Sequence, residues 1–300
     1  MPDADAEVQA VKTGEGDAVE IVPPAQVEPL RAEGIKVDIY DLFDFTFYVP
    51  NLDPERTLLF QDKAVRQALF TALDRDAITK NIFLGYGEAA IGSQPKLSPA
   101  YAPDRITTKY AYDPARAKEL LAQAGWTDSN DDGTVDKDGE KMEFEFLYTG
   151  GSATVDQMVA YLQDAWQAIG VKMQPRAVEG AALYNSLGSH DFEMALLAFQ
   201  WTPDGSQSAM FACASYDNGF NYAKYCNPTW DELDAQQKRE LDRAKRIDLL
   251  IQQSNIVWDD QPVSILRFGV GRTAYTPKLH NFYPSGYGFL WSLPYVWIES

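Results

Sequence analysis

The chain alternates between segments with the hydrophobic period of a strand and segments with the period of a helix. Residues 43–49 (FDFTFYV) and 142–148 (MEFEFLY) alternate apolar and polar side chains, which predicts strands with one buried face. Residues 192–199 (FEMALLAF) are almost entirely apolar, which predicts a strand in the interior of a sheet. Short apolar runs predict further strands at residues 18–22, 171–178 and 263–268.

Apolar residues at spacings of three and four predict helices between these strands. Asp62 starts the first helix, which we expect to continue through Phe83, because an aspartate side chain caps free N–H groups of a first turn. Asp113 and Pro114 start a second helix. The same spacing predicts helices at residues 155–169 and 180–187, and one long helix between Pro228 and Pro262 with Leu241 among its apolar residues.

The order of these elements indicates the fold class. Two helices follow the first long strand, and strands and helices then alternate to the end of the pattern, which is typical of a mixed α/β domain. No period of about 20–50 residues repeats, which argues against solenoids and propellers. No run of about eighteen apolar residues occurs, so the sequence predicts no membrane-spanning helix.

Charge and motifs limit the function classes. The chain carries 26 Lys and Arg against 44 Asp and Glu, a formal net charge of -18, whereas a nucleic-acid-binding surface needs clustered basic side chains. The motifs G-x-S-x-G, G-x-G-x-x-G and H-E-x-x-H and the P-loop motif are absent. Paired acids such as Asp259/Asp260 diverge on a helix and so make a poor catalytic pair. From the motifs we expect no enzyme, and from the charge we expect no nucleic-acid partner.

An acidic segment has the spacing of the first half of an EF-hand calcium loop. Its oxygen-bearing side chains are Asp128, Asn130, Asp132 and Asp136, with Gly133 where the loop turns sharply. The twelfth position is Gly139 instead of a bidentate glutamate. Two predictions therefore stay open, a single structural calcium or a polar hairpin without metal, and no other cofactor is expected.

Two segments carry a resemblance to a known family. Residues 60–90 (FQDKAVRQALFTALDRDAITKNIFLGYGEAA) and 112–126 (YDPARAKELLAQAGW) resemble phrases of the extracytoplasmic oligopeptide/dipeptide-binding proteins, the family 5 solute-binding proteins of peptide-type ABC importers. The resemblance implies a periplasmic-binding-protein-like lobe with a mixed sheet flanked by helices, in the C-terminal portion of a truncated bilobal receptor. Residues 1–45 would end the first lobe, 46–270 would form the second, and 271–300 would return toward the first.

The resemblance also implies a function and a location. Such a receptor captures a peptide between its lobes and delivers it to a membrane permease, in the periplasm or at the cell surface. A signal peptide or lipid anchor would then be missing from this chain. Relatives of this fold also bind oligosaccharides or nickel complexes, and a rival hypothesis is a calcium-stabilised extracellular interaction module without a small-molecule ligand.

The candidate ligand-binding residues follow the apolar strand at 192–199. Trp201-Thr202-Pro203-Asp204 lies at a strand end, where α/β sheets bind ligands, and the resemblance implies that Asp204 pairs with a ligand ammonium group. Asp204 could instead cap its own turn. Trp201 either stacks on the ligand or packs beneath it. The further predicted contacts are Phe199, Asn221 and Tyr222.

The two cysteines, Cys213 and Cys226, are spaced suitably for a disulfide that closes a loop. Two free buried thiols are the alternative. The extracytoplasmic location that the family resemblance implies favours the disulfide.

Overall fold

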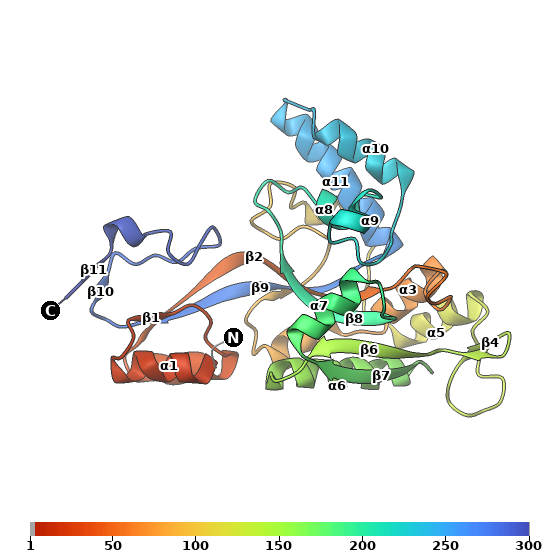
Figure 1. Cartoon of the computed structure of the whole chain (residues 1–300), viewed down its shortest axis with the longest axis horizontal. Coiled ribbons are helices and arrows are strands. Elements are labelled where there is room, and N and C mark those ends of the chain that lie inside the picture. The colour runs from red at the N-terminus through yellow and green to blue at the C-terminus, as the bar shows by residue number, and fades with distance from the viewer. Residues whose placement is uncertain (1–3, 300) are drawn as a thin grey trace.

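The computed structural model describes residues 4–299, and seven strands of this part form one mixed sheet (Figure 1). The strand order is β1-β9-β2-β8-β6-β7, with β3 paired to β9 outside this path. The strand bounds are β1 Ala18–Val19, β2 Lys36–Pro50, β3 Glu88–Ala89, β4 Asp136–Lys137, β5 Glu140–Lys141, β6 Glu143–Thr149, β7 Lys172–Val178, β8 Met194–Gln200, β9 Ser264–Tyr275, β10 Leu279–His280 and β11 Trp297–Ile298. Because β8 lies between β2 and β6, the prediction of an interior strand is confirmed.

Helices flank the sheet, with α6 below it and α10 and α11 above it in Figure 1. The α-helix bounds are α1 Ala4–Thr13, α2 Val27–Ala32, α3 Lys63–Thr71, α4 Arg75–Ala77, α5 Pro114–Gln123, α6 Ala153–Gln167, α7 Gly180–Gly188, α8 Ser208–Phe211, α9 Ser215–Asn218, α10 Pro228–Gln237 and α11 Arg243–Asp260. Short turns complete the list: η1 Pro24–Gln26, the π-helical η2 Ile78–Ile82, η3 Pro103–Arg105 and η4 Leu293–Tyr295. The predicted mixed α/β fold with flanking helices is confirmed.

Aspartate caps start the helices where the sequence predicts them. The Asp62 side chain accepts a hydrogen bond from the Ala64 amide at 2.8 Å, and Asp113 accepts one from Arg116 at 2.9 Å. The helix from Asp62 does not continue unbroken to Phe83. Asp74 instead caps a separate helix, α4, because its carboxylate accepts a hydrogen bond from the Ala77 amide.

The prediction of one long helix between Pro228 and Pro262 is wrong. The segment forms two helices, α10 and α11, which pack against each other. Asp242 accepts hydrogen bonds from the amides of Ala244 and Lys245 and so starts α11 as a new helix. Leu241 lies in the turn between the helices and is 98% exposed, although its spacing fits the apolar stripe.

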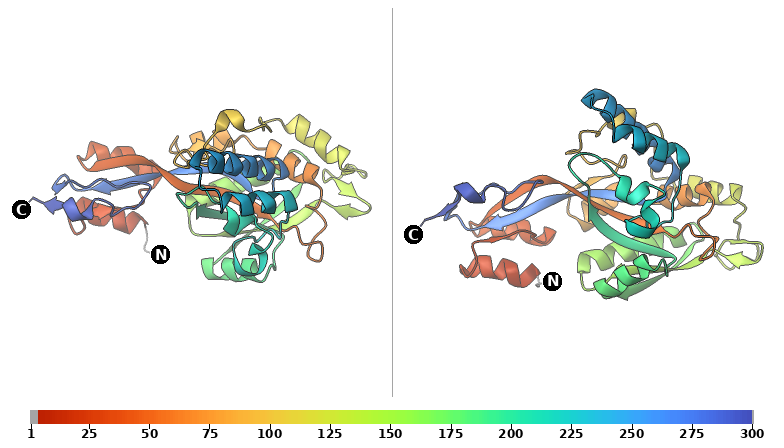
Figure 2. Two further views of the ribbon diagram at one scale, coloured as in Figure 1. Left: turned by 90° about the horizontal axis from the view of Figure 1, so that it is seen from above. Right: turned by 45° about the horizontal axis from the view of Figure 1, so that its top comes forward.

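The longest strands, β2 and β9, form an antiparallel ribbon between two parts of the molecule. They pair from Lys36↔Tyr275 to Tyr48↔Ser264, well beyond the predicted strands at 43–49 and 263–268. Seen from above in Figure 2, the ribbon leaves the larger body and carries α1 and the C-terminal strands at its far end. The predicted lobe boundaries after residues 45 and 270 lie inside β2 and β9, and the division into lobes stays a prediction.

The ribbon contributes to two separate hydrophobic clusters. Phe47 and Ile265 belong to the large cluster of the main body, whereas Val37 and Ala274 belong to a small cluster with α1 and α2. Each end of the ribbon is therefore held by burial in its own hydrophobic cluster. Within residues 4–299, no helix combines the length and apolar character that crossing a bilayer requires.

Candidate ligand-binding site

The segment that follows β8 begins as a continuation of the sheet. The Trp201 amide donates a hydrogen bond to the Phe43 carbonyl of β2 at 3.0 Å, and the chain then leaves the sheet as a loop that reaches α8 at Ser208. This position at the end of an interior strand is the one that the sequence predicts for the site.

Trp201 packs inside the protein, beneath this loop. It is 7% exposed, and its ring stacks on Phe45 with a centroid distance of 4.3 Å. Its indole N–H donates to the Ser93 carbonyl at 2.9 Å. Of the two roles left open for Trp201, the geometry favours packing under the loop over stacking on a ligand.

Asp204 lies exposed in the loop and is already paired. Its Oδ1 accepts the Thr202 hydroxyl at 2.7 Å and the Ser206 amide at 3.1 Å, as an aspartate that caps its own turn does. Its Oδ2 lies 3.0 Å from the Arg246 guanidinium of α11. Partial burial alone would raise the pKa of Asp204, but these hydrogen bonds and Arg246 outweigh it and lower the pKa. The carboxylate is therefore ionised at neutral pH.

A buried polar network, which no sequence pattern predicted, holds the loop from below. Gln207 donates to the Ser93 carbonyl and accepts the Ser93 hydroxyl, both at 3.0 Å, and Ser93 also meets Ser254 of α11 at 2.7 Å. Gln94 donates to the Gly205 carbonyl at 2.9 Å. These bonds fix the loop to the segment after β3 and to α11, so its shape is set before any ligand binds.

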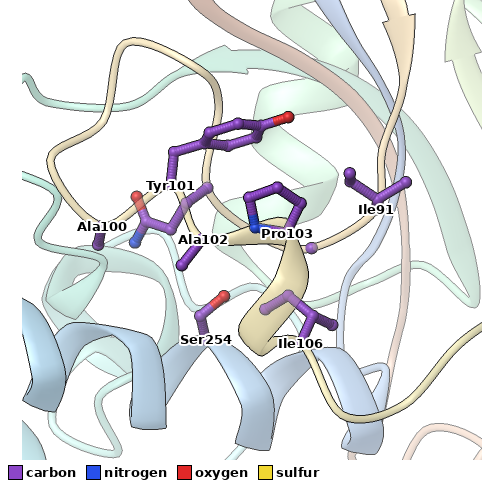
Figure 3. A pocket seen from close by; sticks show the side chains of 9 residues that line it. Ile91, Ala100, Tyr101, Ala102, Pro103, Ile106 and Ser254 are labelled. Atoms are coloured by element: carbon purple, nitrogen blue, oxygen red, sulfur yellow. The ribbon is translucent and has the colours of Figure 1, made fainter.

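The cavity beside this network is too small to be the ligand site. Figure 3 shows the side chains that line it, among them Tyr101, Pro103, Ile106 and Ser254. Its volume is about 10 Å³, which is roughly the space of one water molecule. This cavity therefore has no room for a ligand larger than water.

Phe199 and Tyr222 are brought together, as the sequence predicts for two parts of one site. Their rings meet edge to face at a centroid distance of 6.2 Å, and both are half-buried. Phe220, which the sequence reasoning missed, meets Phe199 at 5.4 Å. The density of aromatic residues in GFNY was its only signal in the sequence. In the described part of the chain, no contact joins Asp204 to these rings.

Asn221 lies inside the protein, and its geometry speaks against the predicted ligand contact. It is 1% exposed. Its amide nitrogen donates to the carbonyls of Ala212 and Tyr225, and its amide oxygen accepts the Tyr225 amide at 3.0 Å. Because both polar ends are bonded to backbone, Asn221 holds the loop that carries Phe220 and Tyr222 instead of facing a ligand.

The predicted disulfide is confirmed. Cys213 and Cys226 are bonded, at a sequence separation of 13. The closed loop contains α9 and the segment with Phe220 and Tyr222. The disulfide and Asn221 therefore constrain the same loop.

Comparison with known proteins identifies the family. The family model described as bacterial extracellular solute-binding proteins, family 5, middle region, matches residues 1–222. This chain belongs to the family 5 solute-binding proteins. The oligopeptide-binding protein AppA of Bacillus subtilis is 28% identical over 286 residues, which cover 94% of this chain and 52% of AppA. The dipeptide-binding protein of Escherichia coli is 28% identical over 68% of this chain and 37% of its own length.

Solved structures agree with this family membership. AppA from Bacillus subtilis in complex with a nonapeptide matches 100% of this chain and 59% of its own, with a TM-score of 0.91 and 27% identity. NikZ from Campylobacter jejuni in complex with Ni(L-His) has the same fold, with a TM-score of 0.85 and 22% identity. The chain thus spans about half the length of the family 5 relatives it matches.

The acidic loop of this family 5 chain does not have the geometry of a metal site. The Asp128 carboxylate accepts the Asp132 and Gly133 amides, and Asp132 forms an ion pair with Lys141. Asp136 accepts hydrogen bonds from Ser129. Among the residues that the structure places, no group of three or more His, Cys, Asp and Glu side chains could hold a metal ion. The structural calcium and the metal-free polar hairpin both stay predictions.

Calcium is expected to leave thermal stability unchanged. The midpoint of unfolding should shift by less than about 1 °C between excess EGTA and millimolar calcium, because Lys141 and backbone amides already satisfy these carboxylates. Differential scanning calorimetry measures this directly. A calcium ion at a hundred times its dissociation constant would add about 2.7 kcal/mol, so a rise of several degrees would restore the calcium hypothesis.

Proposed function

We propose that this chain is part of an extracytoplasmic receptor that captures a peptide and delivers it to the permease of an ABC importer. The observation that carries the proposal is the match to AppA, a peptide-complexed relative that superposes on the whole chain at 27% identity. The names of the other relatives support the same ligand class, since they include di- and tripeptide-binding and glutathione-binding proteins.

The proposed mechanism is hinge closure around the ligand. The β2–β9 ribbon is the element that would bend, because it alone carries long strands from the main body to the small N- and C-terminal part (Figure 2). We assign residues 46–270 to one lobe and residues 1–45 and 271–300 to the edge of the other. Several large side chains of the last segment are exposed, including Trp291, Tyr295 and Trp297. These would pack against the part of the fold that the longer relatives contain.

Asp204 is proposed to hold the ligand ammonium group. Its ionised carboxylate has room for more than the bonds from Thr202, Ser206 and Arg246, because two carboxylate oxygens offer about four acceptor positions. The network under the loop keeps the carboxylate in one place. A peptide amine would therefore join Arg246 at Oδ2 or displace it.

Thermal shift with a chemical panel tests the proposed function. We expect stabilisation by peptides of two to nine residues and none by cello-oligosaccharides or nickel–histidine, since bound ligand raises the unfolding midpoint. Stabilisation by a sugar or a nickel complex would keep the receptor role and discard Asp204 as an ammonium anchor. If no member of the panel binds, the interaction-module hypothesis gains and the peptide receptor is rejected.

The Asp204→Ala variant is expected to lose peptide affinity and little stability. The exposed ion pair with Arg246 contributes about 1 kcal/mol or less to the free energy of unfolding. Loss of a charge-assisted hydrogen bond should weaken binding of a peptide with a free amine about tenfold or more. Titration calorimetry with free and N-acetylated forms of one peptide measures the difference.

A second exposed pair on α11 supplies the matched control for Asp204. Asp248 lies 2.7 Å from Arg105, so Asp248→Ala removes a similar ion pair at a different place. Its peptide affinity should equal that of the wild type. If Asp204→Ala binds both forms of the peptide as the wild type does, the anchor role is wrong.

A further inference from the structure

Three rings form an aromatic cluster at the edge of the core, defined as Phe199, Phe220 and Tyr222. Phe220 meets Phe199 at 5.4 Å and Tyr222 at 6.2 Å, in edge-to-face geometry. Phe220 is 50% exposed. The pKa of Tyr222 is raised, first by its partial burial and then by its electrostatic interaction with Tyr184 of α7.

The exposed rings are held in position by bonds that do not involve them. The Phe220 amide donates to the Ala209 carbonyl at 2.7 Å. The neighbouring Asn221 makes three hydrogen bonds to backbone from a fully buried position, and the Cys213–Cys226 disulfide closes the loop. These bonds fix the backbone at Phe220 and therefore the point from which its ring projects. An apolar ring fixed at the surface in this way is preorganised for a partner, because little conformational freedom is lost on binding.

The aromatic cluster is continuous with the candidate ligand site. Trp201 stacks on Phe45 at 4.3 Å, Phe45 stacks on Phe47 at 5.0 Å, and Phe47 meets Phe199 at 5.3 Å. This row of rings runs under the surface from the loop of Asp204 to the aromatic cluster. Phe199 lies in β8 two residues before Trp201, so the aromatic cluster begins at the strand end that carries the candidate site.

We propose that the aromatic cluster is a subsite for an aromatic side chain of the bound peptide. The proposal rests on the proposed function and adds to it the class of side chain that the receptor selects. Rings that present both edges and faces favour another aromatic ring over an aliphatic group of the same area. A charged side chain of the ligand would lose hydration against these rings, so the cluster favours an uncharged group.

Matched peptides test the subsite. The tripeptides Ala-Phe-Ala and Ala-Ala-Ala differ only in one ring, and NMR titration of each against the 300-residue chain gives two dissociation constants. We expect the Phe peptide to bind about tenfold more tightly. In the Phe220→Ala variant this ratio should fall to about threefold or less, with the affinity for Ala-Ala-Ala unchanged.

Two further variants keep the result interpretable. Phe220→Leu retains an apolar side chain without the ring, so it should also lose selectivity. It replaces Phe220→Ala in the test if circular dichroism shows that the alanine variant does not fold. Tyr112→Ala removes an exposed aromatic ring elsewhere and should retain the full ratio. Equal binding of both peptides by the wild type, or full selectivity in Phe220→Leu, overturns the subsite but leaves the peptide receptor standing. Failure of both peptides to bind, or binding of cellotriose that depends on Phe220, overturns the proposed function as well.

Discussion

The Trp201→Ala variant is expected to unfold with a free energy about 3–5 kcal/mol lower than that of the wild type. The indole is almost fully buried, stacks on Phe45 and bonds to the Ser93 carbonyl. Its removal leaves a cavity under the loop that carries Asp204. Urea unfolding, with the slope compared between the two proteins, measures the loss.

Trp291 provides the matched control for this substitution. It is the same residue type but is 67% exposed in the C-terminal segment, so Trp291→Ala should change the free energy of unfolding by less than about 1 kcal/mol. A Trp201→Ala protein that keeps its stability but no longer binds peptide would contradict the packing role. It would show that the indole contacts the ligand directly.

Replacing Cys213 and Cys226 together with serine is expected to lower the free energy of unfolding by about 3 kcal/mol. The disulfide closes a 13-residue separation, and in the chain-entropy model its stabilising effect comes from restricting the unfolded chain. Denaturant unfolding with and without reductant measures the effect. The wild type should lose this amount on reduction, whereas the double variant should not respond.

The same substitution should also loosen the loop that carries Phe220 and Tyr222. Peptide affinity is therefore expected to fall more for Ala-Phe-Ala than for Ala-Ala-Ala, because the exposed rings would no longer be held in one geometry. A double variant as stable as the wild type in denaturant would contradict the stabilising role. Equal losses of affinity for both peptides would show that the disulfide does not hold the rings of the aromatic cluster in place.

Much of the fold could be predicted because it depends on local chemistry. Asp62 and Asp113 cap helices through amides two and three residues away, so the sequence alone contains the whole interaction. Asp242 is a cap of the same kind, but the fit of Leu241 to a helical period concealed the break before it. The outer halves of β2 and β9 were missed because each depends on its partner strand, and Gly269 and Gly271 interrupt the apolar pattern of β9.

The candidate site likewise has features that the sequence predicts and features that depend on distant residues. The position of Trp201 and Asp204 at the end of an interior strand followed from the apolar run before them. The partners of this loop did not, because Arg246 lies 42 residues from Asp204 in sequence, and Ser93 lies 114 residues from Gln207. Asn221 has the right neighbours for a ligand contact, but burial decides its role, and burial depends on the disulfide-closed loop around it.

We propose that a peptide binds at the end of β8, over the loop of Asp204 and the aromatic cluster. Amide chemical shifts of the isotope-labelled chain, followed during titration with Ala-Phe-Ala, test where the ligand sits. We expect the largest changes on residues 199–208 and 219–222. Changes confined to the tips of α10 and α11, or no changes at millimolar peptide, would contradict it.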